Sequence, residues 1–368
     1  MPEPLKNSYT PTFVEQLLTS YNVIDPQLNK KEVHDFVFGN GWKELELKAR
    51  ISRLAKSMEL FLPSAFPKAA PVVCELITKL HDDNHSVASF EYMFIPEYVE
   101  KNGIDYPELS FEALKHITQY TSCEFAIRPF IIKYEERSME FMLSCSLSSH
   151  QNVRRFASEG CRSRLPWAMA LPRFKKDASL NIPILENLKA DNSLFVRKSV
   201  ANNLNDISKN HESLALELAQ KWHGEDENTN WIVKHGMRTL LKEGNPSAME
   251  LFGYANINYF EISAVKILTP AVQFGKSLLF EFKLRNKTRT EQKIRLEYAI
   301  YFLKNNGTQS KKVFKISERT INSQELLTVE KQHKLVPIST RKYYQGEHAL
   351  SVIINGVEFE KHVFLLNM

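Results

Sequence analysis

The chain has 368 residues, of which 43% are hydrophobic and 25% charged, with only 12 glycines and 16 prolines. This balance excludes collagen-like, low-complexity and disordered chains, and the length favours two or three domains. No stretch approaches the ~18 consecutive apolar residues of a membrane span, and the first residues lack a secretion-signal pattern. The four cysteines show no metal-like spacing and require no disulfide framework. We therefore expect a cytoplasmic protein that makes no membrane contact.

The net charge of +5 is unevenly distributed. Residues 1–120 carry 12 basic and 17 acidic residues, residues 121–254 carry 18 and 16, and residues 255–368 carry 18 and 10. The segment 151–198 alone holds 10 basic residues against 4 acidic ones. Such local asymmetry favours a polyanionic partner such as nucleic acid, although a basic segment can also be only a solvated face.

The first two-thirds of the chain is predicted to be helical. In residues 42–62, apolar positions recur mostly every three or four residues among charged ones, which is typical of an amphipathic helix. Further helical segments are predicted at 67–82, 94–103, 110–122 and 124–145. Helix breaks or kinks are expected at Pro63, Pro67, Gly103 with Pro107, and Pro172.

A repeat follows, marked by Val153, Val196 and Val233, each in a helical stripe that begins with a polar turn. The intervals of 43 and 37 residues are close to the ~40–47 residues of HEAT-type helical repeats. Stacked helix pairs make a curved solenoid, and basic residues at the repeat starts can line one concave edge. These residues are Arg154, Arg155, Arg197, Lys198 and Lys234. The plainer alternative for such an array is a protein-binding scaffold.

After about Tyr254 the sequence changes to seven short β-branched and aromatic runs separated by Asn, Gly, Ser or Pro turns. This pattern predicts an immunoglobulin-like sandwich without an inter-sheet disulfide, because no cysteine lies there. We therefore predict an all-α HEAT-like helical solenoid at 1–254, followed by an all-β immunoglobulin-like sandwich at 255–368. The basic sandwich could serve solubility or provide a second contact to phosphates.

Glu124 has a plain structural interpretation. Thr121 and Glu124 match a capping box, and Arg128 stands four residues after Glu124 as a helix ion-pair partner. Caps and pairs of this kind are common on helices.

Glu159 is harder to explain as a surface residue. It is predicted inside a repeat helix, with Arg155 four residues before it and Arg162 three residues after it. Gly160 beside it is small enough for another backbone or a ligand to approach. Trp167 follows Leu-Pro and either fills the core or presents its indole to a base or sugar.

Other chemistries have little support. The sequence contains no GxGxxG, P-loop, HExxH or GxSxG motif. His81 and His85 are four residues apart, but a turn is expected between them, so a metal site is not predicted. We expect no metal and no cofactor.

Three blocks carry a resemblance to a known family: EFAIRPF at 124–130, SEGCRSRLPWA at 158–168 and Val-Arg-Lys at 196–198. With them, the chain resembles the AlkC-like branch of the bacterial HEAT-like DNA alkylation-repair glycosylases. The helical N-terminal region and the immunoglobulin-like domain are also similar to that branch, so the resemblance spans essentially the whole chain.

The resemblance implies a base-excision-repair enzyme that removes N-alkylated bases, typically 3-methyladenine and 3-methylcytosine, from double-stranded DNA. Such enzymes are thought to expose the lesion by bending the duplex rather than by enclosing a flipped base. By motif match the catalytic acids fall on Glu124 and Glu159 and the neighbouring aromatic on Trp167. An N3-alkylated base is already cationic and leaves without protonation, so carboxylates are needed to stabilise the sugar cation and to orient water.

No lysine nucleophile stands out, so the expected enzyme is a monofunctional glycosylase, acting as a monomer on duplex DNA that contains alkylated bases. The alternatives are a non-enzymatic DNA- or protein-binding scaffold and a sensor of alkylation damage. Phosphate contacts are expected from Arg154, Arg155, Arg162, Arg164, Arg173, Lys175, Lys176, Arg197 and Lys198.

Overall fold

The computed structural model describes residues 3–338 and 341–368. The chain divides between Gly236 and Met237 into two compact units, one helical and one containing the β-sheets. A helical region followed by an immunoglobulin-like sandwich is thus confirmed. The expected boundary after residue 254 stays a prediction, and two short helices before it, α15 (Arg238–Glu243) and α16 (Pro246–Leu251), group with the sheets.

Each predicted helical segment overlaps a helix of the structure, but the segment 42–62 forms only a helix at Leu47–Ser57 and a 3₁₀ turn, and the helix at 110–122 already ends at Ile117. The segment 124–145 divides at Tyr134, and Pro67 lies in the first turn of its helix, where proline is tolerated. The helices are α1 Pro11–Ile24, α2 Lys30–Phe38, α3 Leu47–Ser57, α4 Phe66–Asp82, α5 Phe94–Asn102, α6 Pro107–Ile117, α7 Arg128–Lys133, α8 Glu135–Ser146, α9 Gln151–Gly160, α10 Pro172–Lys176, α11 Ile182–Leu188, α12 Leu194–Ser208, α13 Glu212–Trp222 and α14 Glu227–Gly236. Short 3₁₀ turns lie at Leu5–Ser8, Met58–Leu60, Phe90–Met93 and Ser179–Asn181.

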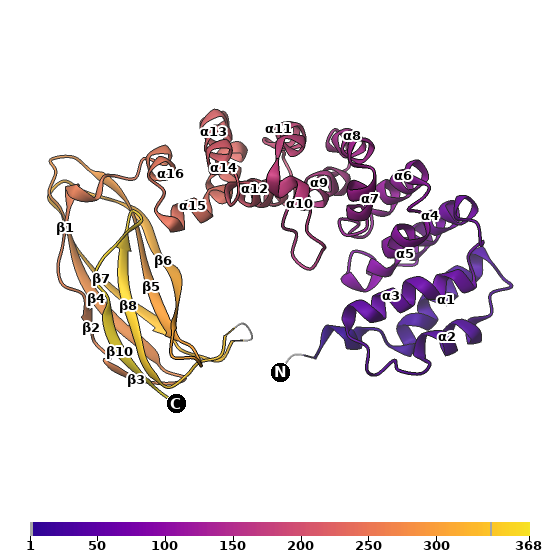
Figure 1. The fold of residues 1–368 in the computed structure, drawn as a ribbon, viewed down its shortest axis with the longest axis horizontal. Helices are drawn as coiled ribbons and strands as arrows, with labels where there is room; N and C mark the ends of the chain where they lie inside the picture. The colour runs from indigo at the N-terminus through magenta and orange to yellow at the C-terminus, as the bar shows by residue number, and fades with distance from the viewer. Residues whose placement is uncertain (1–2, 339–340) are drawn as a thin grey trace. The chain divides into compact units, whose positions relative to one another are not determined.

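These helices stack in two layers (Figure 1). One layer runs through α4, α6, α8 and α11, and the other includes the neighbours α9, α12 and α14. The valines that mark the repeat, Val153, Val196 and Val233, lie on these last three helices and are buried. The apolar stripe therefore predicts the stacking, because each repeat helix buries that stripe against its neighbours.

The second unit is a sandwich of two sheets. In one, β4 pairs with β1, β2 and β7, and in the other the strand order is β3-β10-β8-β5-β6, with β9 paired to β8. The strands are β1 Phe260–Ile262, β2 Lys266–Ile267, β3 Ala271–Gln273, β4 Ser277–Asn286, β5 Gln292–Leu303, β6 Gln309–Ile321, β7 Leu326–Lys334, β8 Gly346–Ile354, β9 Val357–Glu358 and β10 His362–Asn367. A further 3₁₀ turn lies at Ile257–Tyr259.

Alternating burial explains the sandwich. Along β4, Phe280, Phe282 and Leu284 are buried among the core residues, whereas their neighbours point outward. The first and last of the seven predicted runs, at 260–268 and 357–366, each contain two strands, and β3 lies outside all seven. Within the described residues, no helix is long and apolar enough to cross a membrane.

Two glycines attach α15 and α16 to the sheets. Gly244 ends α15 in the left-handed conformation, and Gly356 lies in the turn between β8 and β9 with φ +81°. A Cβ added to Gly356 would lie 2.2 Å from the Gly244 Cα. The two backbones can therefore approach only because both residues lack a side chain.

Gly356→Ala is therefore expected to lower the free energy of unfolding by about 2–4 kcal/mol, through left-handed strain and a backbone clash together. Gly307→Ala is the matched control, because Gly307 has φ +78° but open space around its missing Cβ. Denaturant unfolding followed by circular dichroism would measure both. Equal losses in the two variants would contradict the close-contact explanation.

Candidate active site

Glu124 lies in the connection between α6 and α7 and is only 2% exposed. Its carboxylate accepts hydrogen bonds from the Ser122 hydroxyl and from Nη1 of Arg155 on α9. The predicted capping box is wrong: α7 begins only at Arg128, and the Thr121 hydroxyl is buried with no hydrogen-bond partner among the described residues. Glu124 is thus held by contacts distant in sequence rather than by a helix start.

Arg128 does not serve Glu124 as the sequence suggested. Its buried guanidinium donates from Nη1 to the carbonyls of Gly160 and Arg162, both at 2.8 Å, and from Nε to that of Met169 at 2.6 Å. Burial lowers the pKa of Arg128 to about 10, so it stays protonated at neutral pH. This one side chain anchors both ends of the loop between α9 and α10.

Glu159 lies in the last turn of α9 and is 6% exposed. Its Oε1 is 2.6 Å from Nη1 of Arg162 and 4.0 Å from Nη2 of Arg155, the two partners expected from the helical spacing. Because Arg155 also binds Glu124, its guanidinium bridges the two glutamates. The structure therefore brings both predicted acids into one buried network.

A third carboxylate, Asp206 on α12, extends this network and was missed by sequence reasoning. Its Oδ2 is 2.9 Å from Nε of Arg162, and its Oδ1 is 3.1 Å from Nζ of Lys209. Burial alone disfavours the charge of Arg162, but Glu159 and Asp206 outweigh it and raise the pKa of Arg162. The sequence feature that could have revealed Asp206 is the run NNLND at 202–206, which places polar residues inside a helix predicted to be buried.

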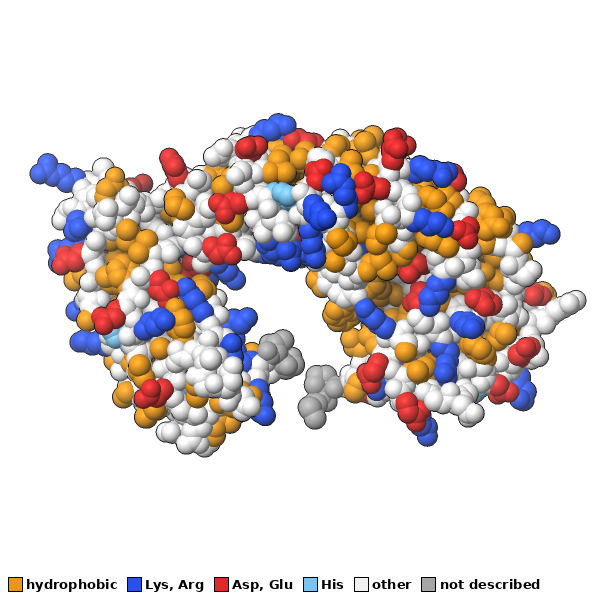
Figure 2. Space-filling model, in the orientation of Figure 1, with side chains coloured by type: hydrophobic (Ala, Val, Ile, Leu, Met, Phe, Trp, Pro, Cys, Tyr) orange, Lys and Arg blue, Asp and Glu red, His pale blue; other side chains and the backbone are white. Residues whose placement is uncertain are grey.

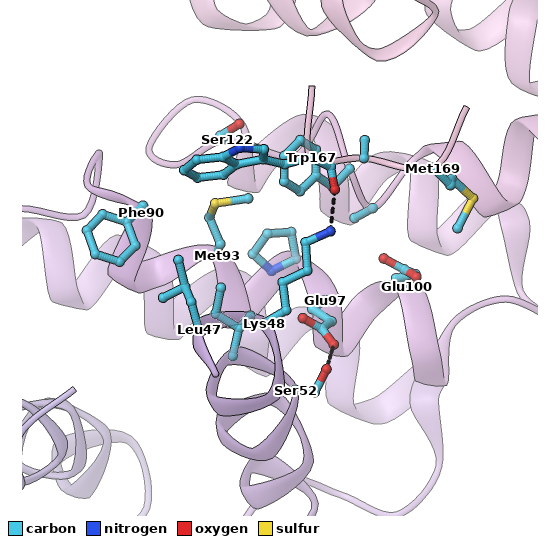
Figure 3. Close-up of a pocket in the computed structure, with 15 residues that line it drawn as sticks. Leu47, Lys48, Ser52, Phe90, Met93, Glu97, Glu100, Ser122, Trp167 and Met169 are labelled. Atoms are coloured by element: carbon cyan, nitrogen blue, oxygen red, sulfur yellow. Dashed lines mark hydrogen bonds between the residues drawn. The ribbon is translucent and has the colours of Figure 1, made fainter. Parts of the chain in front are cut away.

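Trp167 lies in the loop between α9 and α10 and is 64% exposed. Its φ of +67° is in the left-handed region, an unfavourable conformation for a bulky residue that its surroundings must hold. The Lys48 amine donates a hydrogen bond to the Trp167 carbonyl, and Arg128 holds the Met169 carbonyl two residues later. Figure 3 shows the indole over a pocket of about 210 Å³.

A second cavity, of about 170 Å³, lies beside Glu124. Arg155 and Phe195 line it, and the Arg155 guanidinium lies 4.4 Å from the centroid of the Phe195 ring. Ser122 lines this cavity and also the pocket under Trp167. Ser122 therefore binds the Glu124 carboxylate and lines the same pocket as Trp167, although the two blocks are far apart in sequence.

Two of the predicted phosphate ligands hold the loops that precede their own helices. Arg154 pairs with Asp191 through Nε at 2.6 Å and Nη2 at 3.1 Å, and it also donates to two carbonyls of the loop before its helix. Arg197 makes the equivalent contacts one repeat later, to the carbonyls of Asp191 and Asn192. The Val-Arg pattern recurs because in each repeat the arginine holds the loop that precedes its helix. Contact of these arginines with DNA stays a prediction.

The other predicted phosphate ligands differ in their partners. Arg155 and Arg162 belong to the carboxylate network, whereas Arg164 donates to the Asn210 side chain. Arg173 lies near Asp177 and Glu135. The remaining lysines are half-buried or exposed: Lys175, Lys176 and Lys198. Figure 2 shows basic side chains gathered over this part of the helical unit, around α10.

The second unit matches a family model described as "Uncharacterised protein YhaZ, C-terminal Ig-like domain" over residues 261–368. The chain is also 40% identical over 352 residues to the uncharacterized protein YhaZ of Bacillus subtilis (strain 168), covering 96% of each chain.

A solved structure of the Pseudomonas fluorescens alkylpurine DNA glycosylase AlkC, bound to DNA containing an abasic site analog, matches with a TM-score of 0.93. The two chains are 31% identical, and the match covers 100% of each. The chain belongs to the AlkC-like family. In this AlkC-like chain the first two of the three blocks that suggested the family touch directly, because Arg128 of the first donates to carbonyls of the second.

In this AlkC-like fold, Arg128→Lys is expected to lower the free energy of unfolding by about 2–4 kcal/mol, since an ammonium cannot span three carbonyls. Arg137→Lys is the control, because Arg137 is half-exposed in a surface pair with Glu108 and should change stability by less than about 0.5 kcal/mol. Chemical denaturation measures both values. Comparable stability of the two variants would argue against the anchoring role.

Proposed function

We propose that this chain is a DNA glycosylase that hydrolyses the N-glycosidic bond of cationic N-alkylated bases, 3-methyladenine and 3-methylcytosine, in duplex DNA. The observation that carries the proposal is the pair of buried carboxylates, Glu124 and Glu159, bridged by Arg155. Ser122, which binds Glu124, lines the same pocket as the exposed Trp167. The likeness to AlkC, an alkylpurine DNA glycosylase, supports it. The enzyme acts as a cytoplasmic monomer in base excision repair.

The reaction needs little besides negative charge. The alkylated base carries a positive charge and departs as a neutral molecule when the bond to C1′ breaks. Positive charge then develops on the deoxyribose, and a water molecule adds to C1′ as its proton passes to a carboxylate. Carboxylates stabilise this charge and accept the proton, as in glycoside hydrolysis. No step requires an amine nucleophile, so the proposed enzyme is monofunctional and leaves the abasic strand intact.

Arg155 indicates where the sugar cation would lie. Its planar guanidinium occupies the space between Glu124 and Glu159 and has 21% of its side chain exposed. A position that holds a planar cation between two carboxylates has the charge complementarity that an oxocarbenium-like sugar requires. In the proposed complex, Arg155 turns toward a DNA phosphate and the sugar takes its place.

Trp167 and Asp206 complete the proposed machinery. The exposed indole of Trp167 contacts the lesion or its sugar and attracts the charged base through its π face, which favours alkylated over normal DNA. Asp206 holds Arg162, and Arg162 in turn positions the Glu159 carboxylate. The basic residues of 151–198 would bind the phosphates of a bent duplex.

The central test is base release from methylated duplex DNA, measured by mass spectrometry. Glu124→Gln and Glu159→Gln should each lower the single-turnover rate by about 10² or more while DNA binding survives, as is common for electrostatic catalytic groups. Glu140→Gln, an exposed carboxylate on α8, should keep the full rate. Unfolding curves establish that the variants are folded.

The same measurement separates the alternatives. A scaffold would bind DNA without releasing any base. A damage sensor would prefer alkylated duplex, and Trp167→Ala would abolish that preference with no catalytic phenotype. Full activity in both glutamine variants would exclude the proposed mechanism.

The proposed phosphate contacts have their own test. Lys176→Gln and Lys198→Gln should each weaken duplex binding regardless of sequence and reduce the slope of log K against log salt by about 1. Lys31→Gln, at an exposed position on α2, is the control and should leave the slope unchanged. Fluorescence anisotropy at several salt concentrations measures these slopes, and unchanged slopes for both lysines would remove them from the interface.

A further inference from the structure

The pocket under Trp167 has the chemistry of a site for a planar heterocycle. Phe90 and Met93 line it together with Trp167, so that two aromatic rings and a thioether contribute to its walls (Figure 3). Its volume of about 210 Å³ is below the ~300–1,000 Å³ of sites for drug-sized ligands, which limits the occupant to roughly one base. Aromatic faces and sulfur favour stacking with a flat ring.

Polar groups line the same pocket. Glu97 and Glu100, one turn apart on α5, and Lys48 on α3 are among its lining residues (Figure 3). The Glu97 carboxylate is occupied by the Ser52 hydroxyl and by Lys101 at 2.6 Å. Glu100 is therefore the better acceptor for an amino group of a ligand, and the Lys48 amine can donate to a ring nitrogen.

We propose that this pocket receives the methylated base after its bond to the sugar has broken, and that it binds released bases with an exocyclic amino group more tightly than bases without one. The inference rests on the proposed function and deepens it. Ser122 places the pocket next to Glu124, since its hydroxyl binds that carboxylate while the residue lines the pocket. The neutral base leaves C1′, stacks on Trp167 and donates its amino hydrogen to Glu100.

The ionisation of Glu100 supports this role. Burial and the neighbouring Glu97 raise the pKa of Glu100 to about 7, whereas Lys101 opposes the shift. A carboxyl group with a raised pKa is neutral below that value and charged above it. Lys48 is the other charged residue that lines the pocket, and its amine binds the Trp167 carbonyl rather than the Glu100 carboxylate. Acceptance by Glu100 should therefore strengthen as the pH rises through about 7.

The experiment measures binding of free 3-methyladenine to the full chain without DNA. The probe is the NMR shift of the Trp167 indole N–H, assigned with Trp167→Phe. We expect saturable binding with a Kd of about 1 mM or tighter, the range for a ligand of about ten heavy atoms. Glu100→Gln should weaken it about tenfold at pH 8 and by much less at pH 6, and the ratio of the two proteins' affinities at each pH cancels protonation of the ligand.

Controls make the result decisive. Glu112→Gln, at an exposed carboxylate on α6, should bind like the unmodified protein, and Phe90→Leu should weaken binding by removing one wall. Thermal unfolding verifies that each variant is folded. Absence of saturable binding up to about 10 mM, or equal affinity in Glu100→Gln and Glu112→Gln, would overturn the inference. A protein that releases bases from DNA but fails these tests would retain the proposed function without the pocket.

Discussion

The burial of one guanidinium, that of Arg128, is the constraint on which the geometry of the site depends. A charge removed from water must be compensated, and here three carbonyls supply the compensation. One of them ends α9, the second follows two residues later and the third lies beyond Trp167, so the exposed loop has little freedom to move. The strained backbone of Trp167 is tolerated because both sides of that residue are anchored. A rigid loop of this kind can present an indole to a ligand at little entropic cost.

In the carboxylate network, the cost of burying several charges is balanced against the attraction between them. Glu124, Glu159 and Asp206 are almost fully buried, and arginines between them neutralise their charges. Buried ion pairs of this type contribute little net stability, because desolvation offsets the attraction. Their arrangement is better understood as preorganisation: the carboxylates are already desolvated and oriented before DNA arrives, and in the proposed complex only the Arg155 guanidinium has to move.

The sequence predicted features that depend on local periodicity. The repeat helices follow from the burial of Val153, Val196 and Val233, and the pairing of Glu159 with Arg162 follows from a spacing of three residues. It could not predict contacts between distant segments. The pairing of Glu124 with Arg155 spans 31 residues and that of Arg162 with Asp206 spans 44. From the sequence, a repeated arginine such as Arg154 could be interpreted as a phosphate ligand or as part of a solvated basic face. Only the structure shows that it binds backbone carbonyls and Asp191.

The contact between Gly244 and Gly356 has a consequence for how such chains are assembled from parts. The helices α15 and α16 look from their sequence like the end of the helical array, yet their backbone packs against a turn of the sandwich. A transplanted sandwich that began at residue 255 would lack this packing surface together with the buried side chain of Met249, so its turn at Gly356 would be exposed to solvent. The natural unit of exchange, in recombination or in protein engineering, therefore begins near Met237.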